Sequence, residues 1–136
     1  MATFNKFECF VGDVGLKLHN LNTDTLAIYL SNAAPSASLD AVKANLAEIT
    51  NEHGYTAPVD IENTYSQTGG IGTLAGVDKV ITADGGTVGP FQYVVLYNSS
   101  NGTDNLIGWW VYPASITLQD GETFTTNFAA SILTIQ

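Results

Sequence analysis

Hydrophobic and polar residues alternate along much of the chain in short runs, a pattern that is typical of β-strands. The clearest runs lie between residues 87 and 128, where β-branched and aromatic residues dominate. Such residues fit a pleated, half-buried surface. Turn-forming residues separate the runs at 98–102 and at 120–121. We therefore predict three consecutive antiparallel strands, near 91–98, 105–112 and 122–128.

Shorter runs elsewhere predict further strands of the same kind. They lie at 24–32, 59–66, 72–82 and 131–135, and the run at 59–66 alternates so that one face should be wet. Six to eight short strands separated by turn residues indicate a mainly β domain, either an antiparallel β-sandwich or a barrel-like fold. A length of 136 residues fits a single domain, residues 1–136, that can bury a real core.

Two segments carry a helical pattern instead. In residues 3–18 apolar side chains recur at steps of three or four, with Thr3 as a possible N-cap. This predicts a helix at 3–18. The alternative is that residues 1–20 form an extended arm whose phenylalanines dock on a neighbouring subunit. A second pattern at 39–49 fits a short helix or an irregular excursion.

The charge balance excludes one class of partner and disfavours another. The chain has thirteen acidic residues, four lysines and no arginine, for a net charge of −9. Binding a phosphate backbone depends on clustered lysine and arginine, so we exclude nucleic acid as a partner. The same argument weighs against an anionic membrane surface. No secretory signal is visible in the first residues, so synthesis in a cytoplasm is expected.

Groups for catalysis or metal binding are sparse. Cys9 is the single cysteine, which excludes an intrachain disulfide and a cysteine-based zinc site, and we predict that it is buried as a small hydrophobe. His19 and His53 both lie among turn residues and are predicted to be surface loop residues. Asp120 and Glu122 flank a glycine and are predicted to belong to a turn rather than to a catalytic carboxylate pair. We predict no enzyme activity, no cofactor and no metal.

Adjacent tryptophans are the most informative local feature. Neighbouring residues on a strand point to opposite faces, so Trp109 and Trp110 should lie on different sides of the sheet. Either both sides are covered, or one tryptophan joins Tyr112 in an exposed aromatic patch for a protein partner. The candidate protein-contact residues are aromatic side chains from this region and from the N-terminus: Phe4, Phe7, Phe10, Trp109, Trp110 and Tyr112.

Several segments, in the same order, resemble a family of small structural proteins of tailed bacteriophages. These are MATFNKF at 1–7, HNL at 19–21, LAIYLSNAAP at 26–35, LAEIT at 46–50, GYT at 54–56, GPFQYVVLY at 89–97, LIGW at 106–109 and ITLQDGETFT at 116–125. The resemblance runs from residue 1 to about residue 130. The family consists of virion proteins without a catalytic motif, so it implies an assembly role and transfers no site residue.

The resemblance implies a location in the virion. The first expectation is a capsid decoration (cement) protein that binds the major capsid protein on the outside of the shell as a homo-oligomer, with a trimer favoured. A tail or neck component that contacts other virion proteins is the nearest alternative. A third possibility is a receptor- or carbohydrate-binding β-sandwich of a tail fibre, in which exposed tryptophan and tyrosine side chains stack on sugar rings.

Overall fold

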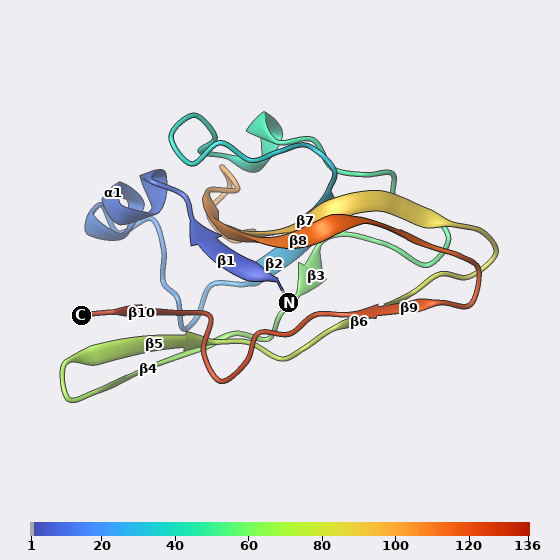
Figure 1. Ribbon diagram of the computed structural model, residues 1–136. Coiled ribbons are helices and arrows are strands. Elements are labelled where there is room, and N and C mark those ends of the chain that lie inside the picture. The colour runs from blue at the N-terminus through green and yellow to red at the C-terminus, as the bar shows by residue number, and fades with distance from the viewer. Residues whose placement is uncertain (1) are drawn as a thin grey trace.

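A five-stranded antiparallel sheet forms the centre of the computed structural model, which describes residues 2–136 (Figure 1). Its strand order is β1-β8-β7-β2-β3. The strands are β1 (Thr3–Lys6), β8 (Leu106–Leu118), β7 (Val88–Asn98), β2 (Leu26–Ser31) and β3 (Val59–Asp60). The longest two, β7 and β8, form the hairpin that the hydrophobic pattern predicts. The mainly β, antiparallel prediction is thus confirmed.

Two smaller sheets lie against one face of the central sheet (Figure 1). One is three-stranded, in the order β10-β5-β4; the other pairs β6 with β9. Their strands are β4 (Thr64–Thr68), β5 (Ile71–Ala75), β6 (Val80–Thr82), β9 (Thr123–Thr125) and β10 (Leu133–Ile135). Between these layers lies the larger hydrophobic core, which includes the fully buried Ile28, Leu74 and Phe91.

The opposite face of the central sheet is covered by irregular chain. Residues 32–58, cyan to green in Figure 1, cross this face and contain only the 3₁₀ turn η1 (Lys43–Asn45). Leu46 from this segment closes a second core with Tyr29, Val95 and Trp109. The Tyr29 hydroxyl donates a hydrogen bond to the Leu46 carbonyl at 3.1 Å. The fold therefore has a covered sheet face on each side.

A buried tyrosine fastens the covering segment to the sheet. Tyr55 ends the turn at 52–55, and its hydroxyl accepts a hydrogen bond from the Leu30 backbone N–H at 2.8 Å. The same hydroxyl donates to Glu48 Oε2 at 2.9 Å, and Lys43 Nζ lies 2.8 Å from Glu48 Oε1. Burial raises the pKa of Tyr55, so the hydroxyl keeps its proton. The network supplies partners for polar groups that burial would otherwise leave unpaired.

The N-terminal segment differs from the predicted helix at 3–18. Residues 3–6 form strand β1, and only Cys9–Gly15 form a helix, α1. Thr3 pairs with Val111 in the sheet and therefore is not a helix cap. The apolar spacing at 3–18 suggested a single helical face. In the structure Phe7 and Phe10 belong to different cores, on the two sides of the sheet. The predicted helix at 39–49 is likewise wrong, and the irregular alternative describes the segment.

Three predicted strand arrangements also need correction. The run at 59–66 splits into β3 and β4, and the run at 72–82 splits into β5 and β6. The third strand of the 87–128 region is shorter than predicted and pairs with β6, not with β8.

In the β7–β8 hairpin Leu96 pairs with Gly108 and Tyr97 with Leu106, so Ile107 is an extra residue in a bulge. Its carbonyl accepts the Phe7 N–H at 3.1 Å.

Candidate functional site

The two tryptophans do lie on opposite sides of the central sheet. Trp110 belongs to the larger core and packs its ring on Phe4 (centroids 4.9 Å apart) and on Phe128 (5.1 Å). Trp109 belongs to the second core and packs on Phe7 at 4.5 Å. Their exposed fractions are only 9% for Trp109 and 6% for Trp110. Both faces of the sheet are therefore covered.

An exposed aromatic patch is thus not formed by the predicted contact residues. Phe7 and Phe10 are buried within the chain, and Phe4 and Tyr112 are partly buried against the larger core. The Tyr112 ring contacts Phe124 at a centroid distance of 5.3 Å. The arm prediction for residues 1–20 is corrected in the same way, because its phenylalanines pack on their own chain. The sequence pattern indicates that these aromatic side chains are buried, but it does not indicate whether their own chain or a partner buries them.

Three exposed large apolar side chains belong instead to α1 and to the residues just after it. Val11 is 61% exposed, Leu16 is 73% exposed, and Leu18 follows two residues later. Val11 and Leu18 belong to the apolar pattern that predicts a helix at 3–18, and the apolar side of that helix was expected to be buried. The predicted helix is shortened because residues 3–6 form strand β1. Only seven residues remain in α1, so the apolar pattern does not continue along one helical face. This apolar surface is the feature that sequence reasoning missed.

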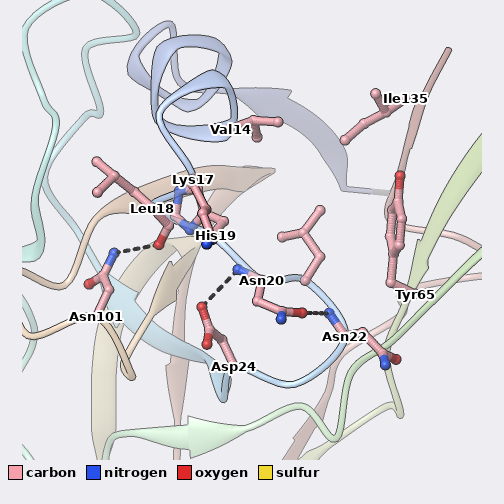
Figure 2. A pocket seen from close by; sticks show the side chains of 11 residues that line it. Val14, Lys17, Leu18, His19, Asn20, Asn22, Asp24, Tyr65, Asn101 and Ile135 are labelled. Carbon is pink, nitrogen blue, oxygen red and sulfur yellow. Dashed lines mark hydrogen bonds between the residues drawn. The ribbon is translucent and has the colours of Figure 1, made fainter.

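Two hollows adjoin this surface, and both reach the C-terminal strand β10. The larger, of about 510 Å³, is drawn in Figure 2 and lies between the α1 end, the loop at 17–24, Tyr65 and Ile135. The other, of about 370 Å³, lies between α1 and β10. Val14 and Ile135 line both hollows, so the two hollows lie next to each other on this side of the molecule.

A buried histidine lies at the wall of the larger hollow. The predicted surface position of His19 is wrong, because its side chain is fully buried. Asn98 Nδ2 donates to His19 Nδ1 at 3.0 Å and to Asp24 Oδ2 at 2.7 Å, while Asn98 Oδ1 accepts the Ser100 N–H. These bonds fix the Asn98 amide. They place the His19 proton on Nε2, 3.9 Å from Asp13 Oδ2.

The surroundings of His19 favour the neutral ring. Burial lowers the His19 pKa below its ordinary value, and the Asp13 and Asp24 carboxylates oppose this effect only in part. A proton on Nδ1 would face the Asn98 amide donor. His19 Nε2 itself has no hydrogen-bond partner, although the atom is buried. A neutral, immobilised imidazole joins α1 and its following loop to the end of the β7–β8 hairpin.

We expect the stability of the protein to fall as the pH drops below about 6.5, the ordinary histidine value. The unfolded chain binds a proton at His19 in that range while the folded chain resists it, so protonation favours unfolding. Urea unfolding between pH 7.5 and pH 5 measures the effect, and His19→Gln should flatten it. His53→Gln, which changes the other histidine, is the matched control. A pH dependence that follows His53 and survives His19→Gln would contradict this assignment.

The remaining candidate groups are engaged in structure. Asp120 Oδ1 accepts the Gly85 N–H at 2.9 Å and Glu122 Oε1 accepts the Gln119 N–H at 2.7 Å, so both carboxylates serve a turn, as predicted. Cys9 is partly buried, and burial, with Asp13 nearby, raises its pKa to about 11. The thiol is protonated at neutral pH and is a poor nucleophile. His53 lies on the surface, as predicted.

Within residues 2–136, no group of three or more histidine, cysteine, aspartate or glutamate side chains is placed to hold a metal ion. The same residues contain no helix that is long and apolar enough to cross a bilayer. Comparison with known proteins finds no matching family model, no similar curated protein and no similar solved structure.

Proposed function

We propose that this chain is a structural protein of a tailed-bacteriophage virion, most specifically a capsid decoration protein that adheres to the outside of the shell. The virion assignment rests on the sequence segments that resemble the phage family. The adhesive role rests on one structural observation, the exposed apolar side chains of Val11, Leu16 and Leu18, of which Val11 lines the hollow between α1 and β10 and Leu18 lines the neighbouring hollow. Exposed apolar surface of this kind is typical of protein contact sites.

The mechanism is mechanical and needs no reaction. Covering an exposed valine or leucine contributes roughly 1.5–3 kcal/mol when burial is complete, so a few such contacts per copy give a modest affinity. Many copies that bridge neighbouring shell subunits add these contributions. Because the protein binds the assembled shell and not its separated subunits, it stabilises the shell by mass action. The net charge of −9 suits an outer position, away from the packaged nucleic acid.

The carbohydrate-binding alternative loses the feature that motivated it. Sugar stacking needs an exposed aromatic ring, and both Trp109 and Trp110 are buried in their own chain. A tail or neck position relies on the same apolar contacts as the shell and differs in copy number. Hundreds of copies over the shell support decoration, whereas a handful at one vertex supports the tail.

The adhesive role predicts that Val11→Asp weakens binding to shells assembled without this protein by at least tenfold in Kd. A buried carboxylate at a contact is costly because it must lose its water. Val80→Asp is the matched control, since Val80 is also 61% exposed but lies in β6, away from α1. Cosedimentation with shells measures binding, and the shell melting temperature measures stabilisation. Equal binding by both variants and the wild type would contradict the proposed contact surface.

A further inference from the structure

Three asparagines at the turn end of the β7–β8 hairpin hold α1 and the loop that follows it. Each donates through its side-chain amide: Asn98 to His19 Nδ1, Asn101 to the Leu18 carbonyl oxygen and Asn105 to Asp13 Oδ2. Figure 2 shows the bond between Asn101 and Leu18 at the wall of the larger hollow. Asn101 Nδ2 also donates to Asn105 Oδ1 at 2.9 Å. The Asn101 amide therefore serves two oxygen acceptors at once.

The residue after Asn101 leaves the side chain open to attack by the backbone. Asn101-Gly102 is the only Asn-Gly pair in the sequence. Gly102 is exposed at a φ of +76°, and an added Cβ would meet no atom within 4 Å. Within residues 2–136 its backbone N–H donates to no carbonyl group. The Gly102 nitrogen can thus approach the Asn101 side chain without a Cβ in the way.

We propose that Asn101 is a site of spontaneous deamidation, and that the product releases the loop at 17–24 from the hairpin turn. The Gly102 backbone nitrogen attacks Cγ of Asn101 and closes a cyclic imide. The Cγ–Nδ2 bond breaks, and Nδ2 leaves as ammonia with the proton of the Gly102 amide. Water then opens the imide at one of its two carbonyl carbons, which gives aspartate or its isomer with the main chain running through Cγ. Water is consumed, ammonia is released and no atom changes its oxidation state.

The hydrogen bonds of the Asn101 side chain delay this reaction but do not prevent it. The bond to the Leu18 carbonyl and the bond from the Asn105 N–H both measure 3.4 Å, beyond the usual range of about 2.7–3.2 Å. Exposed turns also open locally at a low cost in free energy. In the open state the Asn101 side chain can turn toward its own backbone. The inference goes beyond the proposed function and does not depend on it.

A carboxylate in place of the Asn101 amide cannot keep the contact with the loop. The Leu18 carbonyl and Asn105 Oδ1 both lose a donor and face a negatively charged oxygen. Asn105 cannot compensate by rotating its amide, because its Nδ2 donates to Asp13 Oδ2 at 3.1 Å and the rotation would place an oxygen against that carboxylate. An acceptor that loses its donor is costly. The change is one-way, because the ammonia has left.

Peptide mapping by mass spectrometry tests the reaction in the full-length protein. After incubation, the fragment that contains Asn101 should show the mass gain of an amide-to-acid exchange. The gain should appear faster at mildly alkaline than at neutral pH, because the attacking nitrogen must lose its proton. Asn22 is the internal comparator: it is also exposed, but the β-branched Thr23 follows it, so it should stay an amide.

Asn101→Gln should abolish the mass gain, because its longer side chain must close a larger ring. A synthetic peptide of residues 96–106 reports the reaction without the fold. If Asn101 stays an amide in the protein while the peptide reacts, the deamidation proposal is overturned.

Asn101→Asp tests the release of the loop. The backbone amides of Leu18 and Asp24, which are hydrogen-bonded in the wild type, should exchange hydrogen about tenfold faster. Asn127→Asp is the matched control. It adds the same charge at an exposed position but keeps its bond, because Asn127 Oδ1 accepts the Ala129 N–H, and exchange should not change. Far-ultraviolet circular dichroism checks that both variants are folded. Wild-type exchange rates in Asn101→Asp would overturn the proposed release.

Discussion

Trp110→Ala is expected to lower the free energy of unfolding by about 3–5 kcal/mol, as for other large core truncations, and Trp109→Ala by a similar amount. Each indole fills space between two layers. Trp110 lies between the rings of Phe4 and Phe128, and Trp109 packs on Phe7. Truncation leaves a cavity that the surrounding strands can close only in part. Adjacent residues therefore make comparable contributions from opposite faces of one strand.

Denaturant unfolding of the two single variants measures these losses. Leu39→Ala is a suitable control, because Leu39 is the most exposed large hydrophobic side chain in residues 2–136, and its truncation should change stability by less than about 0.5 kcal/mol. If Trp109→Ala had no effect while Trp110→Ala unfolded the protein, the segment at 32–58 would not cover its face of the sheet. Such a result would contradict the second core, in which Trp109 and Leu46 take part.

Gly54→Ala is expected to produce the second large loss, of several kcal/mol. Gly54 has a φ of +94°, which costs an L-residue about 1–2 kcal/mol. A Cβ at this position would also lie 2.3 Å from the Thr82 carbonyl oxygen, so the backbone must move. Overpacking of this kind typically costs a further 1–3 kcal/mol. The turn would separate from residues 82–84, where the Asp84 N–H donates to the His53 carbonyl at 2.8 Å.

Gly85 provides the matched comparison for this substitution. Its φ is +82°, similar to that of Gly54, but an added Cβ would meet no atom within 4 Å. Gly85→Ala should therefore cost only the conformational part, about 1–2 kcal/mol. The difference between the two variants in thermal or urea unfolding isolates the steric part. Equal losses would mean that the contact between the turn and Thr82 is not as close as the structure has it.

Local patterns predicted the strands well wherever a strand has one dominant hairpin neighbour. The β7–β8 hairpin follows from alternation and from the turn residues between its two runs. The opposite-face arrangement of Trp109 and Trp110 followed from strand geometry alone. Each of these inferences depends only on residues close together in the sequence.

The errors arise where distant segments decide the structure. Residues 3–6 are a strand because β8 offers them an edge, which no local pattern records. β9 leaves its neighbour β8 because β6 provides a partner more than forty residues earlier in the chain. His19 is buried because Asn98 and Asp24 surround it after folding. The candidate contact surface could not be predicted either, because it consists of side chains that the completed core does not use.

The connectivity of the central sheet has a consequence for the newly made chain. Thr3 pairs with Val111 and Leu26 pairs with Asn98, so the early strands find their main partners only in the last third of the sequence. Contacts over such separations form only after the chain has lost a large loop-closure entropy. The stabilising energy of the contact comes later, which slows folding. During synthesis Phe7 and Tyr29 therefore stay open to solvent until residues 88–118 have left the ribosome, and this interval is when the polypeptide is most prone to aggregate.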